Sequence, residues 1–203
     1  MEEKDVYAEL SSIRNLMERS SKFISLSGLA GVMVGLYALV GAWFSARIIL
    51  NHEDMGFPPE DVPVIKCAMI VVALAILTLS MVTSYWLTMR KARKKNENVW
   101  NPVSKRLLVA SGVPFLTGGL FVGILLMKEL YTMIPGACLI FYGLALFAGS
   151  QYTYREVRWL GIAEIFLGLC TLSFFGNGLI FWAIGFSLLH IIYGLYMYFK
   201  YER

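Results

Sequence analysis

The sequence has few charged residues for its length. Of its 203 residues only 16% are charged, whereas 58% are hydrophobic and 14% are aromatic. A soluble domain of this size needs more polar sequence to cover its surface, so the composition excludes a soluble globular protein. It indicates an integral membrane protein, whose first partner is the lipid bilayer. The net charge of +4 does not indicate nucleic-acid binding, because the charges lie in short segments beside apolar runs.

Histidine and cysteine are also scarce. Of the two histidines only His190 lies in an apolar run, so the chain lacks the paired histidines of a membrane b-type haem and the ligand cluster of a membrane metal enzyme. The three cysteines form no C-x-x-C pair and predict neither a disulfide framework nor a zinc site. The motifs of zinc peptidases, serine hydrolases and phosphate-binding loops are missing as well. We therefore predict no enzyme activity, no cofactor and no metal.

Long apolar runs are the main feature that is present. The hydrocarbon core of a bilayer requires about 20 residues of α-helix, and six runs come near this length. They cover approximately residues 24–46, 67–89, 107–127, 133–149, 159–175 and 179–199. The sequence therefore predicts an all-α integral membrane protein with six transmembrane helices in one domain, residues 23–203.

The first 22 residues have a different pattern. Apolar side chains recur at three- and four-residue spacing at Val6, Leu10, Ile13 and Met17, with charged residues on the other side. This spacing predicts an amphipathic helix in residues 1–22. Such a helix either lies on the cytoplasmic headgroups or binds a partner.

Lysine and arginine are distributed unequally between the two ends of the predicted spans. Only Arg47, Lys66 and Lys128, of 18 basic residues, lie on one side. By the positive-inside rule both termini are cytoplasmic, and we expect the protein in a bacterial inner membrane. One basic run either holds this topology or binds anionic lipid headgroups. Its members are Arg90, Lys91, Arg93, Lys94 and Lys95.

A pattern Gly-x6-Gly-Leu occurs three times, beginning at Gly28, Gly112 and Gly161. It falls in the first, third and fifth predicted spans, which indicates three helical hairpins in the same orientation. Glycines seven apart share a helix face and let helix backbones approach closely, although glycine is also simply common in membrane helices. The predicted packing residues, within the chain or in a homo-oligomer, are Gly28, Gly31, Gly35, Gly112, Gly119, Gly161, Gly168 and Gly194.

Two titratable residues lie deep in the last predicted hairpin. Glu164 precedes Gly176 by twelve residues, and His190 follows Gly178 by twelve, so both reach nearly the same depth. A carboxylate at mid-span costs at least about 2.5–3.5 kcal/mol, so Glu164 must be protonated, paired or hydrated. One interpretation is a structural hydrogen bond that fixes the hairpin. The other is a ligand- or proton-binding site of Glu164, His190, Ser187 and Thr171, which share small and polar helix stripes.

The last hairpin also resembles a known family. Residues Gly161–Gly185, with Leu167-Gly168-Leu169, the turn Gly176-Asn177-Gly178 and Trp182, resemble the HdeD-like acid-resistance membrane proteins. The resemblance implies a six-span bundle of unassigned chemistry with a link to acid stress. The amphipathic N-terminus, Glu164 and His190 are not part of it.

Two functions are therefore compared. In the first, the bundle binds or transports a small apolar or weakly polar ligand, and the pair Glu164 and His190 links this to a proton. In the second, the protein is a non-transporting sensor or interaction protein. It would then engage a cytoplasmic partner through residues 1–22 and the basic run.

Overall fold

The computed structural model describes residues 27–53, 62–94, 99–174 and 176–203. The amphipathic helix predicted for residues 1–22 lies outside them. The described chain is helical, with no strand among these residues. The elements are α2 (Gly28–Glu53), α3 (Val62–Lys94), α4 (Pro102–Met127), η1 (Tyr131–Met133), α5 (Ile134–Gly149), η2 (Ser150–Tyr152), α6 (Arg155–Ser173), α7 (Gly178–Ala183), η3 (Ile184–Leu189) and α8 (His190–Tyr201). η3 is a π-helix, and the elements η1 and η2 are short 3₁₀-helices.

Five segments of the described chain are long and apolar enough to cross a membrane. They are Gly28–Leu50, Pro63–Lys94, Pro102–Met127, Tyr131–Tyr152 and Gly178–Tyr201. The 19-residue helix α6 is not among them, because it carries Arg155, Glu156, Arg158 and Glu164. The all-α, membrane-like fold is therefore confirmed with five candidate spans, and the sixth stays a prediction.

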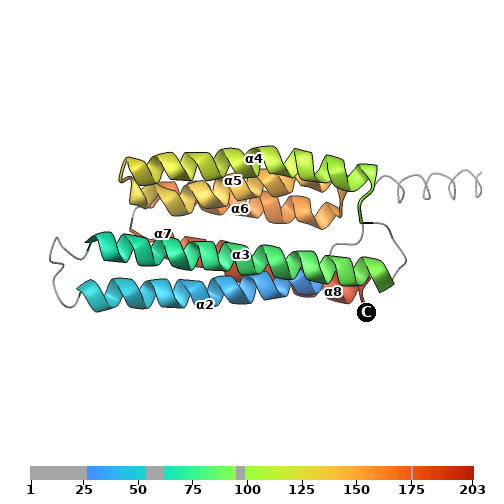
Figure 1. The fold of residues 1–203 in the computed structure, drawn as a ribbon, viewed down its shortest axis with the longest axis horizontal. Helices are drawn as coiled ribbons and strands as arrows, with labels where there is room; N and C mark the ends of the chain where they lie inside the picture. The colour runs from blue at the N-terminus through green and yellow to red at the C-terminus, as the bar shows by residue number, and fades with distance from the viewer. Residues whose placement is uncertain (1–26, 54–61, 95–98, 175) are drawn as a thin grey trace, which may run out of the picture.

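The helices form two groups (Figure 1). In the α5 group, α5 packs between α4 and α6; in the α2 group, α2 packs against α3 and α8. The segment α7–η3 contacts both groups, because α7 touches α5 and α6 while η3 touches α2 and α6. The two arms of the third predicted hairpin therefore have different main partners. The first arm, α6, packs mainly on α5, and the second arm, α7 to α8, packs mainly on α2. Gly28, at the start of α2, and the C-terminus lie at the same end of the bundle.

Close backbone contact between glycines explains these pairings. A β-carbon at Gly161 on α6 would lie 2.7 Å from the carbonyl oxygen of Gly143 on α5. Likewise, a β-carbon at Gly194 on α8 would lie 2.7 Å from the carbonyl oxygen of Gly28 on α2. Any larger residue would separate these helices, so van der Waals contact of the backbones selects the partners.

The predicted packing glycines therefore divide into two sets. Six of them lie in the two interfaces just described, where their β-carbon positions come close to a neighbouring helix: Gly28, Gly31, Gly35, Gly161, Gly168 and Gly194. Gly112 and Gly119 on α4 have no atom within 4 Å of that position. They contact no other described helix there, and their part in packing stays a prediction.

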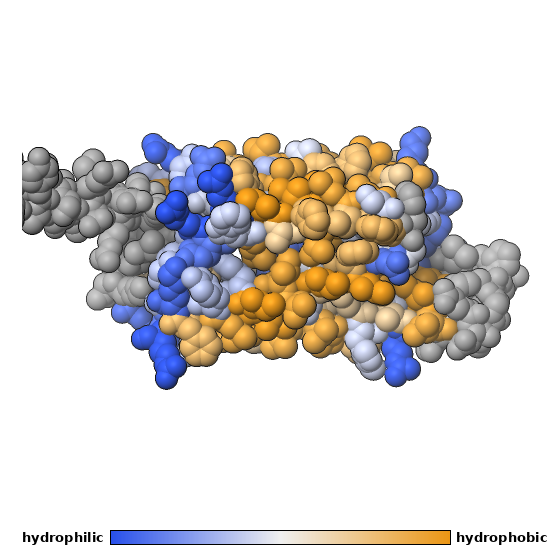
Figure 2. All heavy atoms as spheres, turned by 180° about the vertical axis from the view of Figure 1, so that it is seen from behind, coloured by the Kyte–Doolittle hydropathy of each residue, from blue (hydrophilic) through white to orange (hydrophobic). Residues whose placement is uncertain are grey.

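The surface matches a membrane protein in its distribution of hydropathy. Figure 2 shows a broad hydrophobic band between hydrophilic ends on the face seen there. Helix α3 contributes strongly exposed side chains such as Val71, Met81 and Val82. We call the end that holds Gly28 and the C-terminus the basic end, because most described lysines and arginines flank it. These are Arg90, Lys91, Arg93, Lys94, Lys105, Arg106, Arg155, Arg158, Lys200 and Arg203. Which side of a membrane this end faces stays a prediction.

Candidate functional site

Glu164 lies at the junction of the two helix groups. It extends from α6, one turn from Gly161, and its side chain is fully buried. The nearest titratable group is His190, whose Nδ1 lies 3.4 Å from Glu164 Oε1. Within the described part of the chain, neither oxygen of this carboxyl group has a hydrogen-bond partner. The contact with His190 is therefore a loose approach of two groups rather than a formed hydrogen bond.

His190 is held by two other hydrogen bonds. Its Nδ1 lies 3.0 Å from the carbonyl oxygen of Gly185, and its Nε2 lies 2.8 Å from the hydroxyl of Tyr142. A carbonyl can only accept, so Nδ1 carries the proton and donates it to Gly185. Nε2 then accepts from the Tyr142 hydroxyl, which assigns the neutral tautomer from the network. The proton on Nδ1 is thus already used, and Glu164 receives no donor from the ring.

The π-helix η3 produces this arrangement. Gly185 and His190 lie five residues apart, and the side chain of His190 closes back across the widened turn to the Gly185 carbonyl. Gly185 also makes room for the acid, since a β-carbon there would lie 2.5 Å from Glu164 Oε2 and 2.5 Å from Leu139 Cδ2. One glycine therefore accepts the hydrogen bond of His190 and admits the carboxyl group of Glu164.

Tyr142 is a site residue that the sequence analysis missed. It comes from the middle of α5, and its ring packs 5.0 Å from that of Phe186 and 5.4 Å from the imidazole of His190, between centroids. The sequence did contain a signal. Tyrosines of membrane helices favour the interfaces, whereas this one lies at mid-span, where its hydroxyl needs a partner.

The two other predicted site residues lie apart from this contact. Thr171 is buried, but its hydroxyl donates to the carbonyl of Leu167 on its own helix at 2.8 Å. It is seven residues from Glu164, or about 10 Å along the helix axis. Ser187 is buried in η3, and its carbonyl faces Gly35 of α2. The structure thus brings Glu164 and His190 together, while a role for Thr171 and Ser187 stays a prediction.

One of the predicted headgroup ligands has a partner inside the protein. Lys91 Nζ lies 3.0 Å from Glu202 Oε1, and only 10% of its side chain is exposed. This leaves Arg90, Arg93 and Lys94 as predicted headgroup ligands among the described residues.

No family model, no curated protein and no solved structure matches this chain. The resemblance to the HdeD-like proteins gains no support from these comparisons. Function must therefore be argued from the geometry of the site.

The site is a row of three proton-bearing side chains across the junction. It runs from the carboxyl group of Glu164 through the imidazole of His190 to the hydroxyl of Tyr142. Each member can hold or transfer a proton, and the row links α6 to α5 through the helix that packs on α2. No group of three His, Cys, Asp or Glu side chains lies together within the described ranges, so the row offers few ligands to a metal ion.

Proposed function

We propose that the protein binds or transports a small apolar or weakly polar ligand across a membrane, and that this activity is linked to a proton held at Glu164. The observation that carries the proposal is the state of this side chain. It is fully buried, lacks a hydrogen-bond partner among the described residues, and lies 3.4 Å from a histidine.

A carboxyl group with only a structural role is normally paired, because an unpaired buried charge is costly. Glu164 is buried without a hydrogen-bond partner on the α5 group of helices, and it approaches His190 of the helix that packs on the α2 group. When the carboxyl group of Glu164 is protonated, it is neutral and its burial costs less free energy. When it loses the proton it needs a donor, and the ring of His190 can supply one only by giving up the carbonyl of Gly185. Proton binding would therefore change the junction between the two groups.

The ligand class follows from what surrounds the pair. Among the buried residues of the described chain, Glu164 is the one acid and His190 the one basic group. A strongly charged solute would find no further counter-charge there. The ring of Phe186 stacks on the histidine and that of Tyr142 lies tilted against it, and these rings favour an apolar or weakly polar ligand.

The proposal includes α6 as a sixth span. Its 19 residues extend about 28 Å, close to the thickness of a hydrocarbon core. Three of its four charges, Arg155, Glu156 and Arg158, lie in its first turn at the basic end, so Glu164 is the one charge along its apolar part. With six spans and the positive-inside rule, both termini would be cytoplasmic.

Infrared difference spectroscopy tests the proton site. The protein is reconstituted in liposomes and the pH is changed, so that a carboxyl group that gains a proton shows a carbonyl stretching band. We expect one band from a dry environment that is lost in Glu164→Gln and kept in the matched control Glu156→Gln. An unchanged band in Glu164→Gln would remove Glu164 from the proposal.

Flux measurements test the link to a ligand. Proteoliposomes with a pH-sensitive dye inside are exposed to a panel of small uncharged solutes, and proton movement is followed. We expect solute-dependent proton movement that disappears in Glu164→Gln and persists in Glu156→Gln. Solute movement without protons, and at wild-type rate in Glu164→Gln, would contradict the proton link.

A further inference from the structure

Among the described residues, the basic end of the bundle has more lysines and arginines than acidic side chains. Of the acidic side chains that the structure describes there, Glu156 pairs with Lys200 and Glu202 pairs with Lys91. The remaining two lie elsewhere, since Glu129 pairs with Lys66 at the opposite end and Glu164 is buried at mid-bundle. Within the described chain, Lys105 and Arg106 on α4 therefore form no ion pair with a carboxylate.

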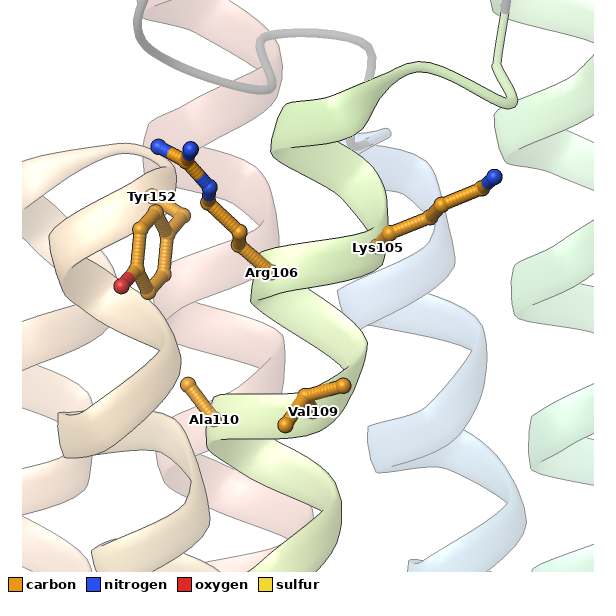
Figure 3. Close-up of a pocket in the computed structure, with 5 residues that line it drawn as sticks. All are labelled: Lys105, Arg106, Val109, Ala110 and Tyr152. Carbon is orange, nitrogen blue, oxygen red and sulfur yellow. The ribbon is translucent and has the colours of Figure 1, made fainter.

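These two cations border a shallow hollow (Figure 3). It has a volume of about 300 Å³ and is lined by Lys105, Arg106, Val109, Ala110 and Tyr152. The guanidinium group of Arg106 lies near the ring of Tyr152, Lys105 extends from the other side of the helix, and Val109 and Ala110 lie one turn further along α4. The hollow thus has a cationic, hydrogen-bonding part and an apolar part.

The apolar part continues into the hydrophobic band of the protein. Further along α4, Val113, Leu116 and Leu120 are 63%, 68% and 74% exposed. In a membrane these side chains contact lipid tails, while Arg106 lies near the end of the helix at headgroup level. The order along the helix, from cations to small apolar residues to exposed aliphatic side chains, is the order of groups along a phospholipid.

We propose that this hollow binds the headgroup of an anionic phospholipid. Arg106 binds the phosphate with its planar group of donors, and Lys105 adds positive charge at the rim. The ring of Tyr152 forms a wall of the hollow beside Arg106, while Val109 and Ala110 contact the first carbons of the tails. The site is separate from the basic run at residues 90–95 and does not depend on the protonation of Glu164.

Lipid retention by the full-length protein tests this proposal. The protein is purified in detergent, incubated with phosphatidylglycerol or phosphatidylcholine, and the lipid bound per protein is measured by native mass spectrometry. We expect phosphatidylglycerol to be retained, and Arg106→Gln to reduce its affinity about tenfold, because charge-assisted hydrogen bonds are lost. Arg203→Gln removes the same charge at the same end, outside both the hollow and the basic run, and we expect it to have little effect.

Further variants and probes separate the alternatives. Arg106→Lys keeps the charge but not the planar donors and should bind with intermediate affinity, which also shows that the fold tolerates a change at this position. Equal losses in Arg106→Gln and Arg203→Gln would reduce the effect to general charge and overturn the site. Equal retention of both lipids would overturn the preference for an anionic headgroup. Full displacement by glycerol phosphate would show that the hollow binds free phosphate esters rather than lipid.

Discussion

Glu202 and Glu164 both lie in crowded surroundings, but the first has several hydrogen-bond donors around it and the second has none among the described residues. Glu202 accepts a hydrogen bond from the backbone amide of Gly28 at 2.6 Å, lies 3.0 Å from Lys91 Nζ, and accepts at 3.4 Å from the hydroxyl of Ser27. It thereby joins α8 to the first turn of α2 and the last turn of α3. Glu164, more deeply buried, has no hydrogen-bond partner among the described residues, and Nδ1 of His190 lies 3.4 Å from its Oε1.

The difference separates a structural carboxylate from one with another role. The amide of Gly28 belongs to the free donors at a helix N-terminus, where a negative charge is favourable. The same fold that assembles three donors around Glu202 leaves Glu164 without any among the described residues. Because isolation of a buried carboxyl group is costly, its presence at this position supports a function that uses a change of charge.

The largest effect should follow from filling the space beside Glu164. In Gly185→Ala the new methyl group would lie 2.5 Å from Glu164 Oε2 and from Leu139 Cδ2. Overpacking of this kind costs about 1–3 kcal/mol, and we expect the upper part of that range because the acid cannot move into water. Thermal unfolding in detergent measures it. Gly119→Ala, where no atom lies within 4 Å, is the control and should be neutral or slightly stabilising.

The infrared band of Glu164 gives this variant a second measurement. If Gly185 positions the acid, the band should shift in Gly185→Ala and stay in place in Gly119→Ala. An unchanged band together with unchanged stability would mean that the close approach of the glycine to the carboxyl group has no consequence.

The comparison of the two acids is tested directly by exchanging each for glutamine. Glu202→Gln leaves Lys91, which is 10% exposed, without its charged partner, and we expect a loss of about 2 kcal/mol in the free energy of unfolding. Glu164→Gln removes a group that has no hydrogen bond to lose, so stability should stay within about 1 kcal/mol or rise. Urea unfolding of both variants decides the matter. A larger loss in Glu164→Gln would make that residue structural.

These two acids also show how far the sequence could predict the structure. Equal spacing of Glu164 and His190 from the turn at residues 176–178 predicted that they meet, because rise per residue fixes depth in a helix. The apolar runs predicted where the helices lie, with ends that differ from the observed ones by up to seven residues. Depth, however, does not determine lateral neighbours. The pairing of α6 with α5 and of α8 with α2 depends on which glycines face each other, and that information is spread over distant segments.

The parts that were not predicted have a common physical cause. The contact of Lys91 with Glu202 joins residues far apart in the chain, and charge counts alone assign a lysine in that run to the lipid headgroups. The π-helix at Ile184–Leu189 has no marker in the local spacing of apolar residues. Tyr142 could have been found from its depth, but not its bond to His190, which needs the packing of α5 against the last helix.

A smaller effect is expected at the third member of the row. Tyr142→Phe removes the hydroxyl that lies 2.8 Å from His190 Nε2 and leaves that nitrogen without its donor. We expect a loss of about 1 kcal/mol in stability and a shift of the Glu164 band, since one of the two hydrogen bonds that orient the His190 ring beside Glu164 is lost. Tyr37→Phe serves as the control, because its hydroxyl lies 3.2 Å from Thr83 in the other helix group. A shift of the band in Tyr37→Phe as well would mean that the infrared signal does not report on the row.

The smallest effect should come from Glu156, which stands between the two extremes. Its Oε1 accepts from Lys200 at 2.6 Å and from Tyr201 at 2.9 Å, while Oε2 is buried without a hydrogen-bond partner among the described residues. Burial raises the pKa of this carboxyl group, but the hydrogen bonds of Lys200 and Tyr201 outweigh it and hold the pKa below its ordinary value. A lowered pKa contributes stability above the unfolded-state pKa, and this contribution is lost as the pH falls through the folded-state value.

Wild type should therefore exceed Glu156→Gln in stability at pH 7 by less than about 1 kcal/mol, since Lys200 is 44% exposed and solvent screens the pair. The difference should close at acid pH, as the pH falls through the lowered folded-state pKa and the carboxyl group of the wild type takes up its proton. Thermal unfolding at both pH values measures it. A difference that persists at low pH would show that the side chain acts through packing rather than charge. Glu156 would then resemble neither Glu202, whose charge is stabilised by donors, nor Glu164, whose carboxyl group lacks them.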